Sequence, residues 1–248
     1  MRQVAALAVL GCIAAISSGC GGAGDQVVSY QGYGGTAIVS ADGRTITVGQ
    51  FGASCPAKVK AVARESDTRV ALFLQFSTPR NPPSCMNAAA AIIPTQKVRL
   101  RAPLGSRELV DGRTGRATAW ITARLILRPA HLPTGYRLAE LIPAVDLSRA
   151  QSPGPAGCTQ FYGSPNKASE LEIIQTAGTL RQPGIARAGG TAIRVRGHPG
   201  HATRNMITWR EHGLTDYILI GVQNPQDSPQ LLSTQQLIAV ADSAPQPG

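Results

Sequence analysis

The sequence predicts a mainly β protein with an α+β C-terminal part: two small antiparallel β modules, the second closed by a C-terminal helix. Three observations carry this prediction. Short runs of β-branched and apolar residues alternate with polar residues at the two-residue period of a half-buried strand. Turn signals rich in Gly, Pro and Asp recur about every ten residues, as in an antiparallel sandwich or small barrel. One helix-start signature occurs, close to the C-terminus.

The first residues of the chain predict a secretory signal. Residues 1–3 are a short basic start, residues 4–16 are almost entirely apolar, and small residues then lead to Cys20. A basic start, an apolar run of roughly 7–15 residues and small residues before a cleavage point are the parts of such a signal. The run is shorter than the roughly 20 apolar residues that a transmembrane helix needs.

The end of this segment, Ser-Ser-Gly-Cys, resembles the lipobox of bacterial lipoproteins. The resemblance implies that residues 1–19 are removed as a signal peptide and that Cys20 carries the lipid. The usual pattern has Leu, Ile or Val three positions before the cysteine, where this chain has Ser17. Two alternatives stay open: lipidation at Cys12, or an ordinary secretory signal cut near residues 21–23.

Residues 20–35 are predicted to be the lipidated cysteine and a glycine-rich tether. The sequence GGAGD at residues 21–25 has too little side chain to pack and is typical of a flexible linker. Several acyl chains, such as palmitate, anchor a protein stably where a single chain does not. We therefore expect a lipoprotein on the extracytoplasmic face of the cell membrane, with membrane lipid as its partner through Cys20.

Residues 36–116 are predicted to form the first β module. Asp42-Gly43 separates two β-branched runs and suits a hairpin turn. The run Arg69–Ser77 has apolar residues on both faces, which indicates a central strand, and the prolines of residues 78–84 indicate a loop. The expected strands are Thr36–Val39, Thr45–Val48, Lys58–Glu65, Arg69–Ser77, Gln96–Arg101 and Glu108–Val110.

The five cysteines have different predicted fates. Cys12 leaves with the signal and Cys20 takes lipid, so Cys55, Cys85 and Cys158 remain in an exported body, where disulfides persist. We expect Cys55 and Cys85 to pair, because both flank the same pair of strands. Closing a loop of that size stabilises a protein by about 3–4 kcal/mol. Cys158 is then a single thiol, with a buried, inert role favoured over a redox or intermolecular one.

The order of features in residues 36–116 resembles a module of exported actinobacterial proteins. The shared features are a cysteine-centred loop after a hairpin, an alternating strand pair, a second cysteine, and two turn motifs. These motifs are PLGSR at residues 103–107 and DGRTG at residues 111–115. The resemblance implies a β fold and a disulfide, and it implies no activity.

Residues 117–243 are predicted to form the second module, followed by a disordered tail at residues 244–248. Ser233 begins a Ser-x-x-Gln capping box, and Leu237, Val240 and Ala241 share the face of the helix that would dock on the sheet. The expected strands are Ile121–Leu127, Arg137–Val145, Thr159–Tyr162, Leu171–Thr176, Thr191–Val195, Met206–Trp209 and Asp216–Val222.

Four short motifs in this half carry a second resemblance. They are a connector at residues 132–136, a turn at residues 195–199, the sequence TWREHG at residues 208–213 and the helix start at residues 232–237. Together they resemble a C-terminal module of Gram-positive lipoproteins and of membrane-anchored anti-sigma or sigma-regulatory proteins. The resemblance implies a β-sheet-plus-helix domain in the envelope that senses or binds.

The chain is basic, with 24 Lys and Arg against 14 Asp and Glu and a net charge of +10. The arginines are scattered, and no aromatic residues are interleaved with a basic run, so the pattern does not indicate nucleic-acid binding. An anionic surface or an envelope protein remains a candidate partner.

Histidines are the main candidates for site chemistry. His198 and His201 lie three apart with Glu211 and His212 nearby, which makes them candidate metal ligands. The Pro-Gly between the two histidines is also typical of a hairpin turn, so we expect no metal and no other cofactor. Ser164 begins a Ser-x-x-Lys pattern like that of penicillin-recognising serine enzymes, but the companion motifs are absent.

The sequence contains no nucleophile elbow, phosphate-binding loop or dinucleotide fingerprint. Trp120 and Trp209 are expected in the core rather than as sugar platforms. The favoured interpretation is therefore a membrane-tethered lipoprotein that acts by binding and is not an enzyme. The alternatives are an envelope signalling or sigma-regulatory component, and a hydrolase or metal-dependent enzyme whose residues converge only in the folded chain.

Overall fold

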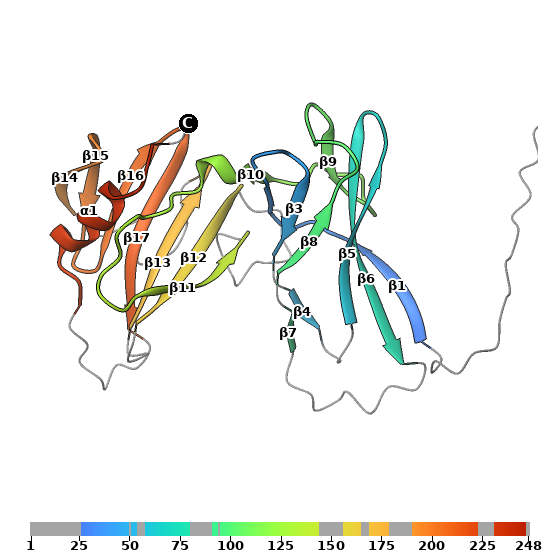
Figure 1. The fold of residues 1–248 in the computed structure, drawn as a ribbon, viewed down its shortest axis with the longest axis horizontal. Coiled ribbons are helices and arrows are strands. Elements are labelled where there is room, and N and C mark those ends of the chain that lie inside the picture. The colour runs from blue at the N-terminus through green and yellow to red at the C-terminus, as the bar shows by residue number, and fades with distance from the viewer. Residues whose placement is uncertain are drawn as a thin grey trace, which may run out of the picture.

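The computed structural model describes residues 26–49, 51–53, 58–79, 91–93, 95–143, 156–164, 169–178, 190–222 and 231–246. It confirms a mainly β fold with a C-terminal helix (Figure 1). The strands are β1 Gln26–Gly32, β2 Ala37–Val39, β3 Thr45–Val48, β4 Phe51–Ala53, β5 Lys58–Glu65, β6 Arg69–Pro79, β7 Ala91–Ile93, β8 Gln96–Arg99, β9 Glu108–Asp111, β10 Trp120–Thr122, β11 Arg137–Ile142, β12 Gly157–Gly163, β13 Ser169–Thr176, β14 Thr191–Val195, β15 His198–Ala202, β16 Met206–Glu211 and β17 Leu214–Val222. The helices are the 3₁₀ turn η1, Ala123–Leu125, and α1, Thr234–Asp242.

The N-terminal half contains the two-stranded sheet β4-β7 and two four-stranded sheets. One has the order β1-β6-β5 with β9 also pairing β6, and the other has the order β10-β2-β3-β8. The predicted central position of β6 is confirmed, since it pairs with β1, β5 and β9. Leu72 and Leu74 of β6 pack with Ile46 and Val48 of β3 in a shared core, which joins the two sheets.

The turn motifs of this half hold the chain by local hydrogen bonds. Arg107 donates to Glu65 Oε2 at 2.9 Å and to the carbonyl oxygens of Ala102 and Pro103. Asp111 Oδ1 accepts from the backbone N–H groups of residues 113 and 114. Both motifs therefore stabilise turns.

Two strands differ from the predicted organisation. Gln26–Gly32 lies within the expected tether of residues 20–35 but forms β1, which pairs antiparallel with β6. Its side chains are almost all exposed, so no hydrophobic alternation marked it as a strand. β10 lies in the expected second module but pairs in parallel with β2 of the first. This pairing is long-range and leaves no local signal in the sequence.

The C-terminal half is an antiparallel sheet of order β11-β12-β13-β17-β16-β15-β14, with α1 on one face (Figure 1). The predicted capping box is confirmed: Ser233 Oγ accepts from Gln236 N–H, and the Gln236 side chain accepts from Ser233 N–H. Leu237, Val240 and Ala241 are buried, as predicted, against a core that includes Ile173, Ile207, Trp209 and Ile218.

Two of the hairpins in this sheet have tight two-residue turns with positive φ at both positions. Arg196-Gly197 joins β14 to β15, and His212-Gly213 joins β16 to β17. Two-residue turns of this kind, type I′, match the twist of the strands that they connect. The hairpin turn expected at the Pro-Gly of residues 199–200 is therefore wrong, because the chain turns three residues earlier and His198–Ala202 is strand β15.

The link between the halves positions the site described below. The predicted strand Ile121–Leu127 is only partly present, because β10 ends at Thr122 and η1 follows. The chain then crosses the end of the large sheet. A small core cluster there joins residues of both halves: Ile38, Ile121, Ile126, Cys158 and Leu214. In the part of the chain that the structure describes, no helix has the length and apolar character needed to cross a bilayer.

Candidate functional site

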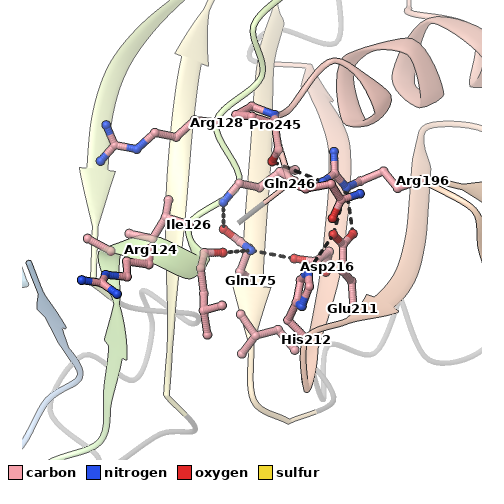
Figure 2. A pocket seen from close by; sticks show the side chains of 14 residues that line it. Arg124, Ile126, Arg128, Gln175, Arg196, Glu211, His212, Asp216, Pro245 and Gln246 are labelled. Atoms are coloured by element: carbon pink, nitrogen blue, oxygen red, sulfur yellow. Dashed lines mark hydrogen bonds and ion pairs between the residues drawn. The ribbon is translucent and has the colours of Figure 1, made fainter. Parts of the chain in front are cut away.

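A pocket of about 310 Å³ lies where η1 and the following residues cross the ends of β13, β16 and β17 (Figure 2). Backbone and side chains of residues 123–128 form one wall, and the charged end of the β16–β17 hairpin forms the other. The polar side chains that line it include Gln175, Arg196, Glu211, His212 and Asp216.

Two buried glutamines hold the wall formed by residues 123–128. Gln175 Oε1 accepts from Leu127 N–H at 2.6 Å, and Gln175 Nε2 donates to Leu125 O at 3.0 Å. Gln160 Nε2 donates to Leu127 O at 2.8 Å. The backbone here leaves regular structure, and buried backbone groups must find other partners. The glutamines provide these partners and fix the loop against the sheet.

Asp216 is the buried acid of the pocket, with only 2% of its surface exposed. Its Oδ1 accepts from Gln175 Nε2 at 2.8 Å. Burial raises the pKa of Asp216 to about 7, because an ionised carboxylate loses its hydration inside the protein. The hydrogen bond from Gln175 and the charge of Arg196 oppose this effect without reversing it. This carboxyl group therefore changes its protonation state close to neutral pH.

Arg196 and Glu211 form a buried ion pair beside Asp216. Arg196 Nε lies 3.1 and 2.8 Å from the two carboxylate oxygens of Glu211, and the side chains are 2% and 5% exposed. Burial alone would raise the pKa of Glu211, but hydrogen bonds from Arg196 and Trp209 outweigh it, so the pKa is lowered. Arg196 also donates to the carbonyl oxygens of Ala241 and Ala244, which ties the end of α1 to the β14–β15 turn.

The C-terminal residues 244–246 were expected to be part of a disordered tail. Instead Ala244 is buried and Pro245 O accepts from Arg196 at 3.4 Å. Pro245 and Gln246 then line the pocket. The cause is Arg196, whose guanidinium donors reach several carbonyl groups of this segment.

The pocket brings three titratable side chains together. Figure 2 shows Glu211, His212 and Asp216 gathered on one side, while the guanidinium groups of Arg124 and Arg128 point away from them. His212 Nε2 lies 3.2 Å from Glu211 Oε1, and 43% of its side chain is exposed. Polar side chains fixed by mutual hydrogen bonds and facing a partly apolar wall are suited to orienting a small polar ligand. A carboxyl group with a pKa near 7 can also exchange a proton with such a ligand.

The predicted metal candidates do not converge. His198 and His201 are three residues apart on β15, so they lie on opposite faces of the sheet. Their predicted neighbours Glu211 and His212 lie at the other hairpin and line the pocket instead. Within the described ranges, no group of three or more His, Cys, Asp or Glu residues is arranged to hold a metal ion.

Of the cysteines with a predicted role after the signal, the structure describes Cys158 alone. Cys20, Cys55 and Cys85 lie outside the described residues. Cys158 is a free, fully buried thiol in the cluster that joins the halves. Burial, aided by the negative charge of Asp216, raises the pKa of Cys158 to about 12. The expected buried position of this cysteine is confirmed.

The remaining candidates have structural positions. Ser164 Oγ accepts from Ser169 N–H at 3.2 Å, while Lys167 of the same motif lies outside the described residues. Trp209 is in the core, as expected, and donates from Nε1 to Glu211 Oε2. Trp120 is 41% exposed, so its expected core position is wrong. It lies on β10, a short strand at the edge of its sheet.

Sequence reasoning missed Gln175 and Asp216, although both leave a signal. Asp216 alternates with Leu214, Ile218 and Ile220 on one face of β17, and an acid among apolar residues on a core face requires a partner. Gln175 lies in the run Ser169–Thr176 in the same way. A search for polar residues on the apolar face of predicted strands would have identified both.

Comparison of the chain with family models, with curated proteins and with solved structures finds no match. The motifs behind the C-terminal resemblance have packing roles here. Leu132 and Tyr136 pack on the core, and Tyr136 and Ser169 share a 2.7 Å hydrogen bond between their hydroxyl groups. Arg196 and Glu211, which belong to two further motifs, form the buried ion pair.

Proposed function

We propose that this protein is a lipid-anchored component of the cell envelope that acts by binding rather than by catalysis. The anchor is proposed from the sequence: an apolar signal, small residues before Cys20 and a glycine-rich linker after it. Lipid at Cys20 would confine the body to the outer face of the membrane and raise its effective concentration near a partner there.

One observation carries the binding proposal: the polar groups of the pocket are already bonded to one another. Glu211 is held by Arg196, Trp209 and His212, and Asp216 is held by Gln175. Among the described residues, no buried side-chain nitrogen or oxygen lacks a hydrogen-bond partner. Such a fixed polar wall favours recognition of a small polar ligand, because little ordering is needed when the ligand binds.

Two measurements test this proposal. In cells, the wild type should carry the mass of acyl chains and partition with membranes, while Cys20→Ala should lose both. If the two proteins differ in mass only by the substitution, the anchor proposal is wrong.

The binding proposal is tested on purified protein, which should be screened against small polar compounds by melting temperature. A compound that raises the melting temperature of the wild type but not of His212→Ala supports binding at the pocket.

A second candidate is an enzyme that uses the same pocket. The observation in its favour is that Glu211, His212 and Asp216 gather in one cavity and that the pKa of Asp216 is about 7. A hydrolase needs a group that can accept and donate a proton near neutral pH. Turnover of a chromogenic ester or glycoside panel that is lost in Asp216→Asn, with the fold intact, would favour this candidate over simple binding.

The envelope-signalling alternative depends on the four C-terminal motifs alone. Cross-linking on intact cells, with neighbours identified by mass spectrometry, separates it from ligand binding. A reproducible membrane-protein neighbour would favour the signalling role, and the absence of a protein neighbour would favour a small ligand or a wall polymer.

A further inference from the structure

One face of the β1-β6-β5 sheet is both apolar and basic. Register and alternation place every second residue of the three strands on this face. We call the following set the basic–aromatic face: Val28, Tyr30, Lys58, Lys60, Arg64 and Phe73. The other face of β5 and β6 packs into the core of the N-terminal half.

The aromatic members of this face are ordered by contact with an arginine. The rings of Tyr30 and Phe73 meet edge to face with centroids 6.4 Å apart. The guanidinium carbon of Arg64 lies 4.9 Å from the Phe73 ring centroid and 6.0 Å from that of Tyr30. Tyr30 is nevertheless 51% exposed and Val28 is 47% exposed. Large apolar side chains displayed beside cations are typical of a surface that meets a partner.

The charge of this face has one sign. Lys58, Lys60 and Arg64 are exposed. The nearest acid of β5, Glu65, points to the opposite face, where Arg107 binds it. Glu108, an acid of the neighbouring strand, is paired with Arg69 at the far end of the sheet. Within the described residues, the part of the face around Lys58 and Lys60 therefore has no compensating negative charge.

The position of the face relative to the N-terminus suggests its partner. Gln26, the first residue of β1, pairs with Pro79 at the same end of the sheet as Lys58 (Figure 1). Gln26 is only six positions after Cys20, and six residues span at most roughly 20 Å. A lipid on Cys20 would thus hold the start of β1 within that distance of the bilayer.

We propose that the basic–aromatic face docks on the anionic lipid surface of the membrane to which the protein is anchored. The inference rests on the proposed lipid anchor for its location, while the charge and the exposed aromatic residues are independent of it. Lys and Arg are attracted to anionic headgroups, and Tyr is favoured at the membrane–water interface. Docking would fix the orientation of the body instead of letting it move freely on its linker.

Vesicle experiments with the full chain test this orientation. Tryptophan is introduced in Tyr30→Trp and, as a matched control, in Leu138→Trp, since Leu138 is 52% exposed on β11 of the other half. Both proteins are placed on vesicles that contain brominated phosphatidylcholine, with or without about one-third phosphatidylglycerol. The parent protein supplies the background of Trp120 and Trp209. We expect the lipid bromine atoms to quench the fluorescence of the tryptophan at position 30 only when phosphatidylglycerol is present. The tryptophan at position 138 should not be quenched.

Charge reversal tests the electrostatic part. Each cation near an anionic surface contributes about fivefold in partition, so Lys58→Glu, Lys60→Glu and Arg64→Glu together should lower binding of the Cys20→Ser chain at least about 100-fold. Lys97→Glu, Arg99→Glu and Arg210→Glu change the same charge on other sheets and should change binding far less. Equal effects of the two triple variants would overturn the proposal.

The outcomes separate docking from anchoring. Cys20-dependent membrane association without quenching at position 30 leaves the anchor intact and overturns docking. A different outcome supports docking and overturns the anchor. In it, the tryptophan at position 30 is quenched both with Cys20 present and in the Cys20→Ser chain, and membrane association in cells does not depend on Cys20. Equal quenching at positions 30 and 138 overturns docking. Docking is also overturned if the protein forms concentration-dependent dimers that protect β1 from hydrogen exchange, because another copy of the chain would then cover the face.

Discussion

Gln175 and Asp216 lie directly opposite each other on adjacent strands β13 and β17, and the Gln175 side-chain amide donates to Asp216 Oδ1 at 2.8 Å. The same amide group bonds the backbone of Leu125 and Leu127 in the crossing segment. One side chain thus connects the acid of the pocket to the loop that forms its wall. A change in the charge of Asp216 acts on a group that also positions this loop.

Asp216 should make the free energy of unfolding decrease as the pH rises. Its pKa is about 7 in the folded protein and about 3.9 in an unfolded chain. Between these values the folded protein binds more protons, so stability is fully present below about pH 4 and is lost as the pH rises through about 7. The slope from this one group is at most about 1.4 kcal/mol per pH unit. Other groups with shifted pKa values add their own slopes.

Urea unfolding of the wild type and Asp216→Asn from pH 4 to 8 isolates this contribution. Asparagine keeps an acceptor oxygen for Gln175 and cannot ionise, so the stability of the variant relative to the wild type should increase with pH. Parallel curves across the whole range would show that Asp216 ionises normally in the folded protein.

Glu211→Gln should destabilise the protein by about 3–5 kcal/mol, because it leaves the buried charge of Arg196 without its counter-ion. The end of α1 should become less protected from hydrogen exchange, since Arg196 also holds the carbonyl groups there. Glu108→Gln is the matched control. Its ion pair with Arg69 is exposed and should contribute only about 0–1 kcal/mol. Similar losses in the two variants would contradict the structural role assigned to Arg196.

Cys158 should be unreactive in the native protein. Its thiol is fully buried and its pKa is raised to about 12, so almost no thiolate forms at neutral pH. Iodoacetamide treatment followed by peptide mapping should leave Cys158 unmodified in buffer and label it in guanidinium chloride. Rapid labelling in buffer would mean that the cluster joining the two halves opens in solution.

Ser233→Ala should lower stability by about 1 kcal/mol, because the first turn of α1 loses its side-chain cap. Gln235→Ala changes an exposed residue of the same turn that takes no part in the capping box, and it should stay within about 0.5 kcal/mol of the wild type. Chemical denaturation of the two variants gives the comparison. A cost for Gln235→Ala equal to that for Ser233→Ala would show that the reciprocal bonds contribute little.

Most strands could be predicted from the sequence because their signals are local. Lys58–Glu65 and Thr191–Val195 have the bounds that their alternation indicated, and Ser233 caps the predicted helix. β1 was not predicted, and the predicted strand Ile121–Leu127 indicated part of β10 but not its partner. β1 gains its strand structure from β6 and β10 from β2, through pairings between distant residues that no local pattern encodes.

The candidate site was predicted much less well than the fold. The spacing of His198 and His201 made them candidate metal ligands, but strand alternation places them on opposite faces of the sheet. The pocket instead depends on residues from five separate segments, including Gln175, Arg196 and Asp216. Their convergence follows from sheet order and from the path of residues 123–128, which are determined by the whole chain.

The pairing of β1 has a mechanical consequence for a chain held at Cys20. The strand runs from Gln26 into the body, and seven register pairs connect it to β6 (Figure 1). A force that pulls the body away from Cys20 would act along the axis of β1. The hydrogen bonds between β1 and β6 would then be loaded in shear and would share the force, rather than break one after another. With the proposed lipid on Cys20, β1 would then be the element that carries the load when a partner bound to the body pulls it away from the membrane.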